Sequence, residues 1–204
     1  MSAVPTKSNL MATKKSLDLS GVGYELLDRK RNILIREMMA LIGKASEIQE
    51  KIDSTYSDAY TALQRAQIVL GMCEPMAQAV PVEDGLSLSF RSVMGVELPT
   101  VTLEERNIGL PFGLSNSDSL LDDAYLKFTE VKRLTVELAE VENSVYRLAD
   151  AISRTQKRAN ALKNILIPKF ESEVKEITEA LEEKEREEFS RMKVIKLQHA
   201  QEEE

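Results

Sequence analysis

The chain has 204 residues, of which 30% are charged and 5% aromatic, with 8 glycines, 6 prolines and no tryptophan. This composition disfavours a thick globular core or a large sheet and suits long helices. The formal net charge of -7 argues against general nucleic-acid binding, which needs clustered basic residues to neutralise phosphates. The single cysteine, Cys73, excludes an intramolecular disulfide framework. The sequence contains no run of roughly 18 apolar residues, the length that a membrane-spanning helix needs.

A first long helix is predicted from residue 10 to residue 70, after a flexible N-terminus at residues 1–9. The stretch contains no proline, and its apolar residues recur at alternating steps of three and four, as in a coiled coil. The apolar stripe is narrow, so it can cover one neighbouring helix but cannot form a deep core. Its two seams are Leu27, Leu34, Leu41, Ile48, Thr55, Ala62 and Val69, and Met38, Ala45, Ile52, Ala59 and Ala66.

Residues 71–119 form a predicted insertion, because this segment holds most of the glycine and proline of the chain. Leucine and phenylalanine alternate with serine over residues 86–90, and a second alternating run follows Met94 and Gly95. Period-two alternation around a turn predicts a β-hairpin over about residues 86–102. An isolated hairpin is marginal in water, so we expect this one to lean on the helices or on another protein.

A second long helix is predicted over residues 120–196, followed by a frayed acidic tail at residues 197–204. Pro168 removes a backbone donor and clashes with the preceding turn, which predicts a break in the helix near residue 168. The apolar spacing also departs from the heptad there, which locally unwinds a supercoil. The predicted seam is Leu120, Ala124, Val131, Leu134, Leu138, Val141, Val145, Leu148, Ile152, Thr155, Ala159, Leu162 and Leu166.

Together these elements predict an all-α fold. It is a long antiparallel two-helix coiled coil with a short β-hairpin-containing insertion at the end opposite the termini. The sequence contains no phosphate-binding loop, and its only histidine lies in the charged tail. The many carboxylates fall on outward helix positions with no apolar pocket around them. We therefore expect a non-catalytic protein that has no cofactor and no metal site.

Two blocks of sequence resemble the D subunit, the central rotor shaft of V-type and A-type rotary ATPases. The first is GYELLDRKRNIL, from Gly23 to Leu34, which contains Lys30 and Arg31. The second runs from Arg158 to Lys196 and is more specific. It carries Asn-Ala-Leu at 160–162, Ile-Pro at 167–168 and Glu-Arg-Glu-Glu-Phe at 185–189. With the order helix, hairpin, helix between them, the resemblance covers nearly the whole chain.

The resemblance implies a central-stalk rotor that transmits torque between a catalytic hexamer of A and B subunits and a membrane ion-translocating ring. Such a rotor couples proton or sodium transport to ATP hydrolysis or synthesis on other chains. The paired termini would enter the hexamer, the F subunit would bind alongside, and a funnel-shaped subunit would link the chain to the proteolipid ring. This implies a peripheral location on the cytoplasmic face of a membrane.

We expect a charged turning surface with few bulky apolar residues. Exposed ion pairs are individually weak, so such a surface should not bind the surrounding subunits tightly. Pro168 is the predicted register break, and an asymmetric shaft is needed for three catalytic interfaces to differ. The candidate rotor-surface contacts are Lys30, Arg31, Glu185, Arg186, Glu187, Glu188, Arg191 and Lys193.

The periodicity alone fits a second class of protein equally well, namely a coiled-coil chaperone or scaffold module of prefoldin-like type. Adjoining genes for A-type and B-type catalytic subunits would favour the rotor. An enzyme is a distant third, which intrinsic ATPase activity of the purified chain would revive.

Overall fold

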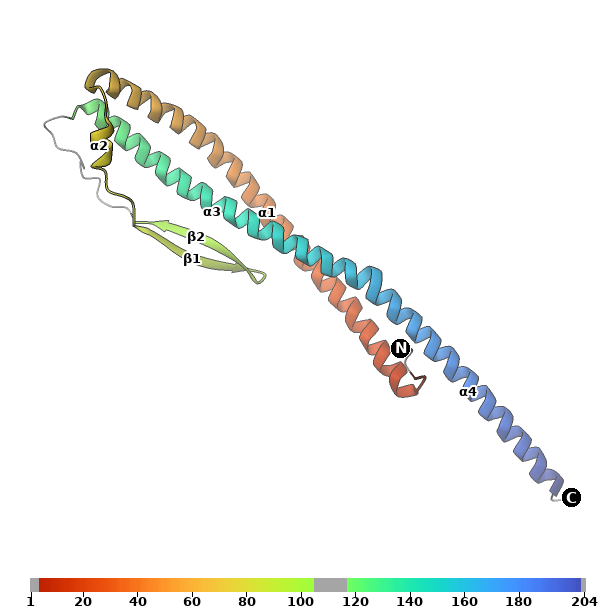
Figure 1. Ribbon diagram of the computed structural model, residues 1–204. Coiled ribbons are helices and arrows are strands. Elements are labelled where there is room, and N and C mark those ends of the chain that lie inside the picture. The colour runs from red at the N-terminus through yellow and green to blue at the C-terminus, as the bar shows by residue number, and fades with distance from the viewer. Residues whose placement is uncertain (1–3, 105–116, 203–204) are drawn as a thin grey trace. The chain divides into compact units, whose positions relative to one another are not determined.

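The computed structural model describes residues 4–104 and 117–202, with side chains as far as Lys196. Two long helical stretches are joined by a segment that contains a short helix and a two-stranded antiparallel hairpin (Figure 1). This arrangement confirms the predicted all-α fold with a β-hairpin insertion. In chain order the elements are α1 (Lys7–Leu70), α2 (Glu74–Gln78), β1 (Leu86–Val93), β2 (Val96–Leu103), α3 (Ser119–Ala161), the π-helical turn η1 (Leu162–Leu166) and α4 (Ile167–Glu202).

Contacts along the chain divide it into two compact units. Unit 1 contains the described residues up to Arg31 and from Ser153 onward, and unit 2 is Asn32–Ile152. Unit 1 thus holds the start of α1, the end of α3, η1 and α4, whereas unit 2 holds the rest. In the described ranges, no helix combines the length and apolar character needed to cross a membrane.

The ends of the long helices follow from local hydrogen bonding. The Thr6 hydroxyl accepts a hydrogen bond from the Asn9 amide at 3.2 Å, which caps α1, and the helix begins at Lys7, within the predicted N-terminal segment 1–9. At its other end α1 stops because Gly71 adopts a φ of 77°, a left-handed conformation that suits glycine after a helix. The predicted frayed tail is likewise helical as far as Glu202, in a stretch that has neither glycine nor proline.

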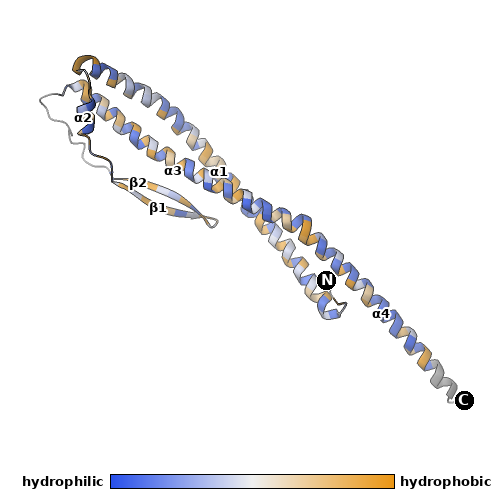
Figure 2. Ribbon diagram, in the orientation of Figure 1, coloured by the Kyte–Doolittle hydropathy of each residue, from blue (hydrophilic) through white to orange (hydrophobic). Residues whose placement is uncertain are grey.

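The core of unit 2 is the seam between α1 and α3, and Figure 2 shows the apolar residues scattered along otherwise polar helices. Small residues dominate one stretch of it, as the alanines of the sequence predicted. Val69 lies off the seam and is 60% exposed, and Leu121 is buried in place of Leu120. The buried residues are Leu34, Ile48, Ile52, Ala59, Ala62 and Ala66 on α1, and Leu121, Ala124, Val131, Leu134, Val141, Ser144 and Leu148 on α3.

The hairpin turns through Met94 and Gly95, whose φ angles of 51° and 77° are both positive. Two positive φ angles define the tight turn whose twist matches that of paired strands. Its inner face carries Leu98, which is fully buried against Leu34 and Leu148. The hairpin therefore leans on the helices of its own chain.

Polar contacts fix the hairpin against α3. The Val101 amide donates to the Glu140 carboxylate at 2.8 Å, and the Arg147 guanidinium donates to the Glu97 carbonyl at 3.1 Å. These bonds satisfy backbone groups on the outer edge of β2, which would otherwise be an open template for pairing. An ion pair at 2.6 Å joins Lys132 of α3 to Glu83, just before β1. Another, at 2.9 Å, joins Arg91 of β1 to Glu37 of α1.

In unit 1, the helix irregularity precedes Pro168. The Ile167 amide donates to the Leu162 carbonyl, five residues back, so the turn before the proline is a π turn. The extra residue shifts the apolar register, and Leu166, predicted to lie in the seam, is 37% exposed. The described buried residues of this unit are Thr155, Ala159 and Ile177.

Candidate partner-binding surfaces

The last part of α4 is a solvent-exposed helix. Every residue from Glu182 to Lys196 is exposed, and the stretch includes Glu188 and Lys193 of the predicted contact set. Four large apolar side chains lie among the charges: Phe189, Met192, Val194 and Ile195. Single exposed apolar groups are ordinary, but Phe189, Met192 and Ile195 recur every three residues, and a contiguous exposed apolar patch indicates a surface that a partner covers.

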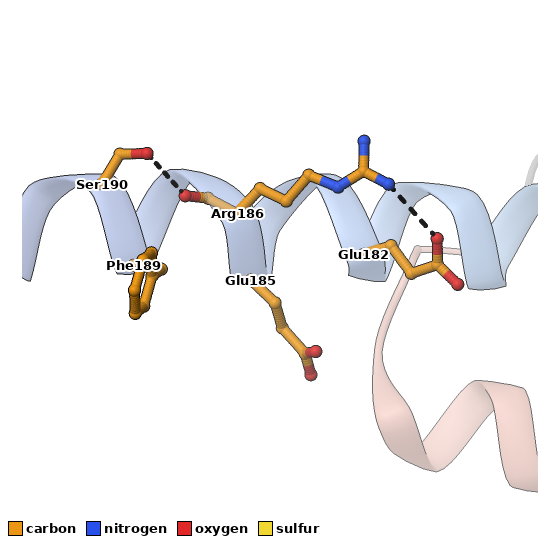
Figure 3. Close-up of a pocket in the computed structure, with 5 residues that line it drawn as sticks. All are labelled: Glu182, Glu185, Arg186, Phe189 and Ser190. Atoms are coloured by element: carbon orange, nitrogen blue, oxygen red, sulfur yellow. Dashed lines mark hydrogen bonds and ion pairs between the residues drawn. The ribbon is translucent and has the colours of Figure 1, made fainter.

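Ion pairs organise the charges of this helix. Arg186 reaches back to Glu182 at 3.7 Å (Figure 3). It also pairs with Glu183 at 3.7 Å, while Arg191 pairs with Glu187 at 3.6 Å. All of these side chains are more than half exposed, so each pair stabilises the helix by only a few tenths of a kcal/mol, about 0.3–0.5 for an (i, i+4) pair. The guanidinium and carboxylate groups therefore remain accessible to a partner.

Glu185 connects α4 to α1. Its carboxylate lies 3.0 Å from the Lys7 ammonium. The hydrogen bond and the charge of Glu185 raise the pKa of Lys7 above its ordinary value. A raised pKa means that the pair contributes below the ordinary lysine pKa and is lost as the pH rises through the folded value, so it is intact at neutral pH.

A shallow hollow lies on the same stretch of α4, lined by Glu182, Glu185, Arg186, Phe189 and Ser190. Figure 3 shows Phe189 and Glu185 projecting from one side of the helix, while Arg186 lies along another side toward Glu182. The Ser190 hydroxyl donates to the Arg186 carbonyl at 2.9 Å. Because all five residues come from one helix, the hollow is a shallow surface depression and not an enclosed active-site pocket.

The two basic residues predicted on α1 differ in environment. Lys30 is half-buried, whereas Arg31 has only 25% of its side chain exposed. The Arg31 guanidinium lies 2.6 Å from the Asp28 carboxylate and donates to the Gln156 amide oxygen at 2.7 Å. Arg31 thus bridges α1 and α3, and roughly seven helical turns separate it from Lys7 and the Glu185 cluster.

The start of α1 carries a second apolar stripe that the sequence interpretation missed. Leu19, Val22 and Leu26 are each more than half exposed, and Met11 continues the row toward the terminus. The expectation of few bulky apolar residues on the outer surface was wrong. The stripe was visible in the sequence as apolar residues spaced three and four apart. It could not be told from the seam that faces the partner helix, because both have the same period.

The outer face of the hairpin is a further exposed apolar surface, within unit 2. Leu86, Leu88 and Phe90 are 51%, 61% and 52% exposed. Arg147 covers part of the Phe90 ring, with its guanidinium carbon 5.5 Å from the ring centroid. This is the face that alternation predicted as apolar, yet apart from the Arg147 contact it is the opposite face, with Leu98, that packs against the helices.

The charged and thiol side chains of the described residues are not arranged as a metal site. Within residues 4–104 and 117–196, no three acidic, cysteine or histidine side chains are grouped as metal ligands. Cys73 is a buried thiol packed with Ala66 and Leu121. The carboxylates of α4 lie on an open helix, where water screens them.

Comparison with known proteins identifies the family. The model of the family described as the D subunit of ATP synthase matches residues 9–197. A protein of Thermotoga neapolitana, named as the D subunit of a V-type ATP synthase, is 41% identical over 198 residues, covering 96% of this chain and 98% of that protein. A protein of Methanobrevibacter smithii, named as the D subunit of an A-type ATP synthase, is 37% identical, with coverages of 94% and 85%. Its counterpart of the same name in Thermococcus kodakarensis is 36% identical, with 94% and 92%. The chain belongs to the family of ATP synthase D subunits.

Proposed function

We propose that this protein is the non-catalytic central-stalk rotor of a V/A-type ATPase. It transmits torque between the catalytic A and B subunits and the membrane ring, coupling proton or sodium transport to ATP hydrolysis or synthesis. The paired helices supply long hydrogen-bonded backbones, interrupted at residues 162–168, on which torque can act. The family match extends over both helices and the hairpin, and it lends no support to the chaperone or scaffold alternative.

The exposed end of α4 is the observation that carries this proposal. A helix with no buried residue from Glu182 to Lys196 forms few stabilising contacts of its own, yet it displays Phe189 and Met192. Such a surface becomes favourable when a partner removes the apolar groups from water. The partner proposed for it is the central cavity of the A and B hexamer.

The rotor-surface contacts proposed within that cavity are mainly the charges of α4. Lys30 extends the set on α1, and Arg31 contributes there by holding the two helices together through Gln156. The full set is Lys30, Arg31, Glu185, Arg186, Glu187, Glu188, Arg191 and Lys193. The F subunit and the funnel-shaped subunit are the proposed partners on the side of the hairpin, with the whole complex peripheral on the cytoplasmic face of its membrane.

Co-expression with candidate A, B and F subunits tests the proposal. Size-exclusion chromatography should show a defined pair with F and a larger complex with A and B, and the larger complex should hydrolyse ATP. A chain that joins neither assembly would exclude the rotor function. ATPase activity of the purified chain alone would contradict its non-catalytic nature.

Charge reversal tests the proposed turning surface. The variant Glu185→Lys, Arg186→Glu, Glu187→Lys, Glu188→Lys should lower ATP turnover of the assembled complex. The matched control exchanges Lys175 and Glu179, an exposed ion pair on the same helix, as Lys175→Glu with Glu179→Lys. Wild-type turnover of the assembled four-residue variant would remove this cluster from the contact set.

A further inference from the structure

The second helix of unit 1 has a weakened hydrogen-bond ladder just before α4. The Ile167 amide bonds to Leu162 and therefore no longer serves the Lys163 carbonyl, its α-helical acceptor. Pro168 has no amide hydrogen, so the Asn164 carbonyl lacks its α-helical donor as well. Two successive carbonyls have thus lost the bond that an unbroken α-helix would give them.

The first helix is weakened at the same level. Gly23 faces η1, because a Cβ atom at Gly23 would lie 3.8 Å from a terminal methyl carbon of Leu162. The Lys163 ammonium lies 5.6 Å from the ring centroid of Tyr24, the next residue on α1. Gly21 lies just before them, and each glycine inside a helix costs about 1 kcal/mol relative to alanine. Both helices of the pair are therefore weakened at the same position along their length.

Packing does not compensate for these weaknesses. None of the residues of η1 is buried, and none lies fully buried between Ala159 and Ile177. In unit 1 no described residue of α1 is buried either. Regions with few buried apolar contacts open locally at the lowest free-energy cost.

From this coincidence we propose that Leu162–Pro168, together with Gly21 and Gly23 on α1, forms a compliant joint in the helix pair. At this joint the helices bend and twist more easily than the segments on either side. Rearranging a π turn moves one residue through the helix, which corresponds to about 100° of rotation and 1.5 Å of translation of the following helix. The joint lets α4 change its direction while the rest of α3 keeps its packing.

The flexibility of the joint stands on the structure of unit 1 alone, whereas its mechanical use rests on the proposed rotor function. If α4 engages the catalytic subunits, the joint would store or release twist between their steps. The test therefore measures the joint in the isolated full-length chain, so that its failure is separate from a failure of the rotor proposal.

Hydrogen exchange of backbone amides in the purified chain measures local opening. The amides of residues 163–167 should exchange at least about tenfold faster than those of residues 155–159, because the weakened segment opens locally at a lower free-energy cost. Pro168→Ala restores the missing donor and should slow exchange in this segment about fivefold, the factor that corresponds to about one net hydrogen bond. Equal amide exchange rates of the two segments in the wild-type chain, or rates unaffected by Pro168→Ala, would contradict the proposed joint.

Coupling across the two helices gives the sharper readout. The double variant Gly21→Ala, Gly23→Ala stiffens α1, and both sites have room for a methyl group, which at residue 23 would contact Leu162. It should nevertheless slow exchange at residues 163–167 on the other helix by about fivefold. Gly43→Ala, also on α1 with no atom within 4 Å of the added Cβ, is the control and should leave these amides unchanged. A double variant that behaves like the control would show that the two weak points do not act as one joint.

Discussion

At the scale of single residues, the contacts that matter most are made by side chains whose sequence context looks ordinary. Leu98 is one of several apolar residues in the hairpin, yet it alone enters the cluster with Leu34 and Leu148 as a fully buried side chain. The more conspicuous alternation of Leu86, Leu88 and Phe90 faces water instead. Alternation predicts that a strand has an apolar face, but only the docking of the hairpin decides which face is covered.

Leu98→Ala should destabilise the chain by about 2–5 kcal/mol, because it removes a fully buried side chain and leaves a cavity between two helices. Leu88→Ala on the same hairpin is the matched control, and its cost should stay within about 0.5 kcal/mol because that side chain is exposed. Urea unfolding followed by circular dichroism measures both. Equal losses of stability would mean that the hairpin is not held by Leu98.

Arg31 illustrates how a charge assigned to the surface can serve the helix pair. Arg31→Ala should cost about 1–2 kcal/mol, because it removes the bond to Gln156 and the partner of Asp28 in a half-buried site. Arg29→Ala is the comparison, since that side chain is 75% exposed and makes only an (i, i+4) pair with Glu25. Thermal unfolding of the two variants should separate them. Similar midpoints would show that Arg31 is no more than a solvated charge.

At the scale of elements, periodicity located both helices and the hairpin, because a seam must recur every three or four residues and a strand face every two. It failed where a local bond overrides the pattern. The cap from Thr6 extends α1, and the π turn at Leu162–Leu166 moves Leu166 out of the seam. Pro168 signalled a break, but a proline alone does not specify whether a kink or a π turn accommodates it.

The hairpin turn offers a direct test at this scale. Gly95→Ala should destabilise the chain by about 1 kcal/mol or more, because its φ of 77° is strained for any residue with a Cβ. Gly43→Ala inside α1 should instead stabilise it by about 0.5–1 kcal/mol, since the site is open and helical. Differential scanning calorimetry compares the two variants. A stabilising Gly95→Ala would contradict the turn geometry.

At the scale of the whole molecule, the buried clusters and the candidate contacts belong to different parts of the chain. In the part of the chain that the structure describes, the three clusters of buried apolar residues lie in unit 2, around Leu34, Ile48 and Ala66. The charged contact set lies mainly on α4 in unit 1. The contact set on α4 stays a prediction, and the sequence interpretation missed the exposed apolar groups within it, because Phe189 and Met192 are sparse within a run of glutamates. Stability and partner binding should therefore be separable.

Removal of residues 182–204 tests that separation. The truncation deletes only exposed described residues, the exposed ion pairs among residues 182–191 and the exposed pair of Lys7 with Glu185, so the unfolding midpoint should fall by no more than a few degrees. Binding to the A and B subunits should nevertheless be lost, because the truncation removes the Phe189 and Met192 surface. Co-elution on a size-exclusion column measures the binding, and the pair with the F subunit serves as the internal control because its proposed contacts lie on the side of the hairpin. A truncated chain that still joined A and B and supported full turnover would move the docking surface elsewhere on the helix pair, with the exposed stripe of Leu19, Val22 and Leu26 as the next surface to test.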